Sequence, residues 1–196
     1  MARPGWLARL PILLLFFAYA CDAAGFVPHT VYWVDYVARG LDRGFGAAGT
    51  QWILFGLGAV AGPILVGRLA GRIGFGPALV SMLLVKAAAV LLPVLVSTLP
   101  ALCLSSLVVG ALTPGIATLT AGYVGEIAGV SGQRAAWGAM TTGFAATQAL
   151  GASGFALLLG ARGSYAELFV LGAALLLLAA VLAETGRRLP PVATPR

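Results

Sequence analysis

Six apolar segments, each long enough to cross a lipid bilayer, dominate this chain. A membrane-spanning helix needs about 20 predominantly apolar residues. The segments that meet this requirement cover residues 10–34, 50–68, 76–98, 100–124, 136–160 and 165–184. Only 9% of the 196 residues are charged and 60% are hydrophobic, whereas soluble domains carry about 25% charged residues. The sequence therefore predicts an all-α, polytopic membrane protein, with a six-span domain over residues 1–186 and a polar cytoplasmic tail over residues 187–196.

The arginines between these segments predict the orientation of the chain, because cytoplasmic loops are enriched in Lys and Arg. The larger set, on one side, consists of Arg3, Arg9, Arg68, Arg72, Arg134, Arg187, Arg188 and Arg196, and the smaller set of Arg39, Arg43 and Arg162. Both chain ends are therefore expected on the cytoplasmic side of a cell inner membrane. The arginines are scattered rather than gathered on one face, so the net charge of +6 does not indicate nucleic-acid binding.

An acidic residue, Asp22, lies near the middle of the first segment. Charge inside a membrane span is costly and marks a candidate functional site. Tyr19, Asp22, Phe26, His29 and Trp33 have the spacing of one helix face, which predicts the wall of a polar cavity. Desolvation favours the neutral form of a buried carboxylate, so Asp22 is a candidate to take up and release a proton. For His29, the only histidine, a satisfied hydrogen bond near the outer interface is the preferred explanation.

Lys86, in the middle of the third segment, is the natural partner for Asp22. The first and third segments run in the same direction, and the two residues lie at depths that agree within roughly 3 Å of helix rise. Either the two side chains neutralise each other, or each faces a water-filled pathway. Pairing is the preferred interpretation for Lys86, and a functional role is slightly preferred for Asp22.

The first and fourth segments share a second feature, an internal proline. Pro28 interrupts the first segment and Pro114 the fourth, so the six segments divide into two groups of three that each begin with a broken helix. Broken helices at matching positions of two repeats indicate the binding site of a transporter. The alternative is that proline is frequent in membrane helices in general. Thr113 and Gln148 are candidates to line such a site, although polar side chains also join membrane helices to one another.

A short motif, Gly151-Ala152-Ser153-Gly154, resembles the GxSG of serine hydrolases. A nucleophilic serine needs a neighbouring base, and His29 lies four segments before Ser153. The sequence therefore argues against an intramembrane serine protease, and no enzymatic activity is expected. Cys21 and Cys103 lie in apolar runs without companion ligands, so neither a metal nor a cofactor is expected.

Two stretches of the chain, YACDAAGFVPHTVYWVDYVARGLDRG and GTQWILFGLGAVAGPILVGRLAGRIGF, resemble the C-terminal half of major facilitator superfamily transporters, in the YbfB/YjiJ-like branch. The resemblance covers nearly the whole chain. Gly67, Arg68, Arg72 and Gly74 match the cytoplasmic signature G-x-L-a-D-R-x-G-R/K of that superfamily. Gly71 stands where the signature has an acidic residue.

The resemblance implies secondary active transport of a small solute by alternating access, with the first and fourth segments lining the pathway. Proton coupling through Asp22 is a separate hypothesis, motivated by the position of this residue in the middle of its segment. The resemblance also implies a second six-helix half as a partner within the lipid bilayer. This chain would then be a truncated gene product, one part of a split transporter, or a half that pairs with a second copy. A non-transporting membrane assembly or scaffold protein is the alternative.

Overall fold

The computed structural model describes residues 10–189, and its regular elements in this range are all helices. In chain order they are α1 (Leu10–Gly25), α2 (Val27–Thr30), α3 (Trp33–Asp35), η2 (Tyr36–Gly40), α4 (Gly44–Ile73), α5 (Phe75–Leu95), α6 (Leu99–Arg162) and α7 (Tyr165–Arg188). The predicted all-α fold is therefore confirmed for these residues. Arg3, Arg9, Arg196 and most of the predicted tail lie outside the described range.

Five helical segments within residues 10–189 are long and apolar enough to cross a membrane. They are α4, α5, α7 and the two segments Leu99–Gly129 and Gly132–Arg162 of α6. Gly129 bends α6 because its φ of 69° and ψ of 171° lie outside the helical region. At 16 residues, α1 is apolar but shorter than a usual span. The structure is thus that of a multi-pass membrane protein whose first segment differs from the other five.

The predicted first span over residues 10–34 is not one continuous helix. Helix α1 ends at Gly25, and Phe26, with φ −98° and ψ 2°, separates it from α2. Pro28 causes this break, because proline has no N–H and its ring clashes with the carbonyl four residues earlier. The chain continues as the short helices α2 and α3 and the π-helix η2. The interruption predicted at Pro28 is confirmed.

The matching interruption predicted at Pro114 is wrong, because α6 continues through this residue. The Thr113 hydroxyl donates to the Val109 carbonyl at 2.8 Å, and the Thr118 hydroxyl donates to the Pro114 carbonyl at 3.0 Å. Neither hydroxyl bonds the Gly110 carbonyl, which Pro114 leaves without its helical donor. Membrane helices tolerate an internal proline where neighbouring helices pack closely, as α4 does on Gly110. The two groups of three segments therefore do not both begin with a broken helix.

The connection between α4 and α5 is shorter than the sequence predicted. Helix α4 covers Gly44–Ile73, where a span over residues 50–68 was expected. Gly74 alone joins α4 to α5, and its φ of 87° is one that glycine adopts without strain. Consequently, the predicted signature up to Arg72 lies on the last turns of a helix rather than in a loop.

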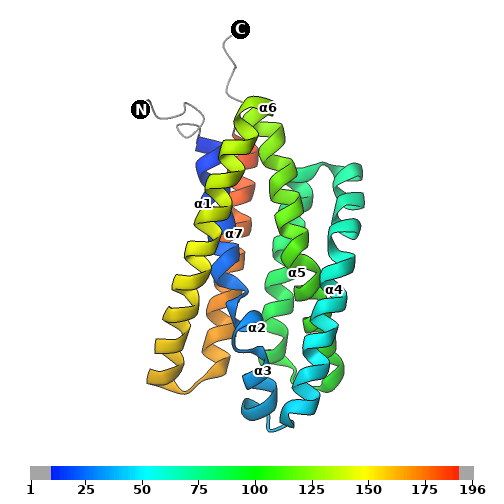
Figure 1. The fold of residues 1–196 in the computed structure, drawn as a ribbon, viewed down its shortest axis with the longest axis vertical. Helices are drawn as coiled ribbons and strands as arrows, with labels where there is room; N and C mark the ends of the chain where they lie inside the picture. Colours follow the sequence, from blue (N-terminus) through cyan, green and yellow to red (C-terminus); the bar gives the residue numbers. More distant parts are fainter. Residues whose placement is uncertain (1–9, 190–196) are drawn as a thin grey trace.

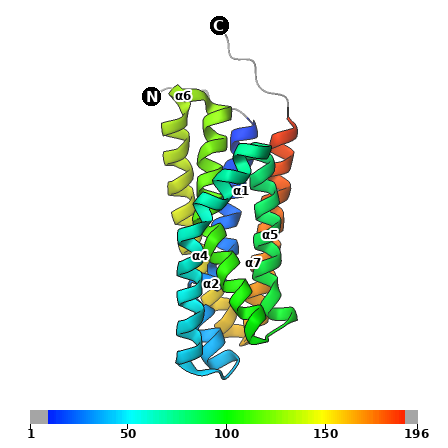
Figure 2. The ribbon, with the colours of Figure 1, turned by 90° about the vertical axis from the view of Figure 1, so that its right-hand side faces the viewer.

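The helices form one elongated bundle (Figure 1). Helix α4 packs mainly on α6, and α7 lies against both α1 and α5. Figure 2 shows α5 and α7 side by side in the turned view. The start of α1, the bend of α6 and the end of α7 lie at the same end of the bundle (Figure 1), which we call the bend end. The opposite end, which we call the η2 end, holds η2 and the turn between α6 and α7.

Helices α4 and α6 approach each other through glycines. Gly58 lies against the Leu107 carbonyl and Gly110 against the Phe55 carbonyl, each so closely that a Cβ would overlap the oxygen. Small residues spaced four apart allow membrane helices to come this close. Gly62, four residues after Gly58, makes the same kind of contact with the Ala111 carbonyl.

Candidate functional site

A buried ion pair joins α1 to α5 in the interior of the bundle. The Lys86 ammonium donates to Asp22 Oδ1 at 2.7 Å, and the two side chains are 0% and 1% exposed. The same ammonium lies 4.1 Å from the centre of the Phe26 ring. Withdrawing both charges from water costs free energy, which their attraction offsets only in a close geometry such as this one. Of the two arrangements considered from the sequence, the structure shows Asp22 and Lys86 paired.

Asp22 has one carboxylate oxygen that the pair does not use. Asp22 Oδ2 and Thr120 Oγ1 are both buried without a hydrogen-bond partner. Both residues line a narrow crevice between α1, α5 and α6, together with apolar side chains such as Leu83 and Ile116. The crevice has no room for a water molecule. Oδ2 is therefore a free hydrogen-bond acceptor that water does not reach, beside a charge that Lys86 balances. A proton is small enough to bind there.

Two aromatic residues of the predicted stripe, Tyr19 and Phe26, pack against the second segment of α6. The Tyr19 ring lies 4.6 Å from the Phe144 ring and 5.7 Å from the Trp137 ring, and Phe26 lies 5.9 Å from Phe144. Tyr19 is 5% exposed and Phe26 is 2% exposed. The stripe therefore faces the interior, as its spacing predicted. It is filled by side chains and does not form the wall of an open polar cavity.

His29 lies closer to the η2 end than Asp22 does, and its ring is held in one orientation by a hydrogen bond and by stacking. Its Nε2 lies 2.7 Å from Ser105 Oγ, and that hydroxyl donates to the Ala89 carbonyl at 2.7 Å. Because the hydroxyl has a single proton, His29 must be the donor in the first bond and carries its proton on Nε2. The ring stacks on Trp33 with 4.3 Å between centres, and Nδ1 is left buried without a partner. The predicted hydrogen bond of His29 is present.

A second polar chain continues from Trp33 across the bundle. The Trp33 indole N–H donates to Ser106 Oγ at 2.9 Å, and this hydroxyl donates to Gln51 Oε1 at 3.0 Å. The Gln51 amide lies 3.4 Å from Cys103 Sγ. Together with the His29 contacts, these bonds fasten the broken first segment to α4, α5 and α6. The sequence analysis missed Gln51, Ser105 and Ser106, although two adjacent serines in the apolar run LCLSSLVV were a usable signal.

Not every predicted site residue joins these two clusters. The Thr113 hydroxyl is bonded within its own helix, and Gln148 is half-buried on the second segment of α6 without a place in either cluster. Arg68 and Arg72 are exposed near the bend end. Ser153 is exposed and donates to the Ala149 carbonyl one turn earlier at 3.1 Å.

Gly67 and Gly74, the other residues of the predicted signature, lie beside these arginines. Gly67 is exposed on α4 with open space around its Cα, and Gly74 forms the turn to α5.

The comparison with protein families finds one that covers most of the chain. A family model described as "Uncharacterised MFS-type transporter YbfB" matches residues 3–184. The match includes every residue of the Asp22 and His29 clusters. Among curated proteins, the comparison finds no match.

Proposed function

Because the chain belongs to this family of transporters of the major facilitator type, we propose that it moves a small solute by alternating access and that a proton bound at Asp22 drives the cycle. Membership of the family accounts for transport in general. The specific proposal depends on one observation, the buried pair of Asp22 and Lys86 with one free carboxylate oxygen.

Protonation of Asp22 would change what holds α1 against α5. With Asp22 ionised, its charge is balanced by Lys86 and the interior can remain dry. A proton on Oδ2 removes that balance and leaves the Lys86 ammonium as an unpaired buried charge, which is costly. The Lys86 ammonium would then be stabilised by contact with water or with a substrate anion. Separation of α1 from α5 would let either of them reach it.

The second part of the proposal is that the solute passes between this chain and another six-helix half. Two helical segments bury few of their residues within the chain. In their apolar stretches, 22% of the residues of α4 and 6% of those of Gly132–Arg162 are buried. Their free faces are available to a partner half. That half would be another chain or a second copy, and both chain ends would face the cytoplasm of the inner membrane.

Reconstitution into liposomes tests the proton step. The purified protein is placed in vesicles containing a trapped pH dye, and a panel of amino acids, sugars and organic acids is added outside. We expect at least one solute to cause proton entry, and Asp22→Asn to abolish this signal. Asp42→Asn is the matched control, because Asp42 is exposed and its φ of 52° suits asparagine equally well. Unchanged proton entry in Asp22→Asn would refute the proton role.

A non-transporting assembly protein is the second candidate, and the complete burial of the ion pair favours it. In such a protein the pair serves only to hold α1 against α5. Exchanging the two charges with Asp22→Lys and Lys86→Asp would then preserve folding and every function. Under the transport proposal the exchanged protein folds but shows no solute-dependent proton entry.

A further inference from the structure

An apolar hollow of about 310 Å³ lies between α4, α5 and the first segment of α6. Its walls include Leu65, Val66, Leu69, Met82, Val85 and Val108. The volume is at the low end of the range of roughly 300–1,000 Å³ that small-molecule pockets have. Leu65 and Val85 are still 57% and 43% exposed, so the hollow opens to the outside of the bundle. On a membrane-spanning surface, the outside is hydrocarbon.

The wall that α4 contributes to the hollow continues into two arginines. Leu65, Arg68, Leu69 and Arg72 have i, i+3, i+4 and i+7 spacing, so they share one face of the helix. Arg68 and Arg72 follow the hollow towards the bend end, where α4 finishes at Ile73. Both are exposed, and neither forms an ion pair with any residue in the range 10–189.

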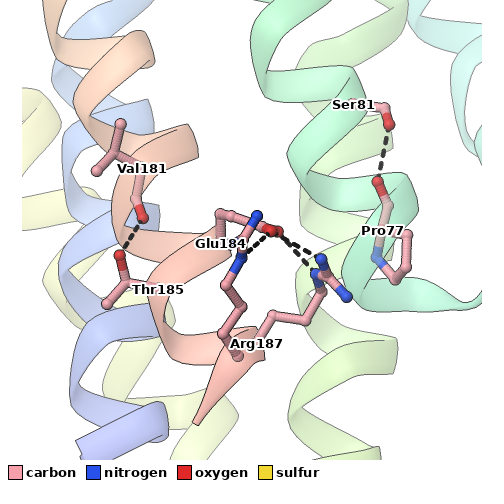
Figure 3. Close-up of polar contacts among 7 residues, drawn as sticks. Pro77, Ser81, Val181, Glu184, Thr185 and Arg187 are labelled. Carbon is pink, nitrogen blue, oxygen red and sulfur yellow. Dashed lines mark hydrogen bonds and ion pairs between the residues drawn. The ribbon is translucent and has the colours of Figure 1, made fainter.

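Two other arginines at the bend end share one acidic partner, Glu184. Glu184 accepts from Arg187 at 2.7 Å and from Arg188 at 2.6 Å, and Figure 3 shows the contact with Arg187 beside the start of α5. Arg68 and Arg72 have no such acid within residues 10–189. They are therefore two uncompensated charges directly beyond an apolar hollow.

From this arrangement we infer that the hollow and the two arginines bind one anionic phospholipid. One of its acyl chains lies in the hollow, and its headgroup phosphate lies between Arg68 and Arg72. Arginine suits a phosphate because its guanidinium presents parallel N–H donors. Basic positions at the end of a groove between membrane helices select anionic headgroups. This inference does not depend on the transport cycle proposed above.

Lipid titration followed by native mass spectrometry tests the inference on the delipidated protein. We expect phosphatidylglycerol to bind more tightly than phosphatidylcholine of the same acyl chains. Arg68→Gln with Arg72→Gln should weaken phosphatidylglycerol binding on the order of tenfold to thirtyfold and leave phosphatidylcholine unchanged. The control is Arg39→Gln with Arg162→Gln, which removes two arginines that pair with acids at the η2 end. Equal binding of the two lipids, or equal loss in the two variants, would overturn the inference.

A second variant tests the hollow separately from the charges. Val85→Trp places a large side chain in the hollow from a position that is already exposed, so the fold should tolerate it. It should lower phosphatidylglycerol binding severalfold with both arginines in place. If inorganic phosphate at the lipid concentration displaces the bound lipid completely, the acyl chain contributes nothing, and the site is for free phosphate instead.

Discussion

Gly62 of α4 lies directly on the backbone carbonyl of Ala111 in α6, with no space between them for a side chain. Helices approach this closely in a membrane only where one of them presents no Cβ. The contact sets the distance between α4 and the first segment of α6. Both residues also line the apolar hollow.

Replacing Gly62 with alanine should destabilise the bundle. The added Cβ would overlap the Ala111 carbonyl, and the two backbones would have to separate. We expect Gly62→Ala to lower the free energy of unfolding by about 1–3 kcal/mol, the usual cost of overpacking. Gly56→Ala, on the same helix with open space around it, should instead be neutral or stabilising by about 0.5–1 kcal/mol. Thermal unfolding of both variants in detergent checks the difference, and equal melting temperatures would contradict it.

Removing Lys86 alone should be costly. Lys86→Met leaves the Asp22 carboxylate buried without its partner, and breaking a buried pair in this way costs about 3–5 kcal/mol. The double variant Asp22→Leu with Lys86→Met removes both charges and should recover most of that loss. Unfolding of the single and double variants in detergent measures the recovery. A double variant as unstable as Lys86→Met would show that the side chains act independently.

The Ser105 hydroxyl should contribute to stability through His29. Ser105→Ala leaves the His29 Nε2–H buried without an acceptor, which costs about 1–3 kcal/mol. Ser153→Ala provides the comparison, since this exposed serine bonds only to its own helix and should change stability by less than about 0.5 kcal/mol. The free energies of unfolding of the two variants should differ clearly. A loss of the same size in both would argue against the His29 bond.

Single cysteines placed at the two ends of the bundle should react with a thiol reagent from opposite sides of the membrane. In a background with Cys21→Ala and Cys103→Ser, the variants Asp42→Cys and Gly71→Cys place single thiols at exposed positions near the η2 end and the bend end. A maleimide that cannot cross the membrane should label Asp42→Cys in intact cells. It should label Gly71→Cys only in inverted vesicles, because arginines are concentrated at the bend end. Labelling of both variants from one side would contradict the bundle orientation.

The amphipathic pattern of the first segment was sufficient to place its side chains. The 3.6-residue period put Asp22, His29 and Trp33 on one face, and all three are buried. Matched depth along two parallel segments identified Lys86 as the candidate partner of Asp22, and the structure shows the two side chains in contact. Both predictions use the rise and period of a helix, which vary little from one protein to another. The breaks between α1, α2 and α3 leave the three residues buried.

The effect of a proline could not be predicted in the same way. Pro28 ends a helix, whereas Pro114 lies inside one that continues. The difference arises from what surrounds each residue. Near Pro114, the Thr113 and Thr118 hydroxyls supply hydrogen bonds within the helix, and Gly110 and Gly115 allow α4 to pack closely.

The sequence by itself determined that this chain is an assembly of apolar helices with an acid and a base at one depth, because lipid admits only segments that satisfy their own backbone hydrogen bonds. Only the tertiary structure decided that the acid and the base touch, that the serines of α6 receive His29 and Trp33, and that an apolar hollow leads to Arg68 and Arg72. These contacts depend on the rotation and separation of neighbouring helices. Helix periodicity does not predict those two quantities, because they depend on which small residues of neighbouring helices pack against each other.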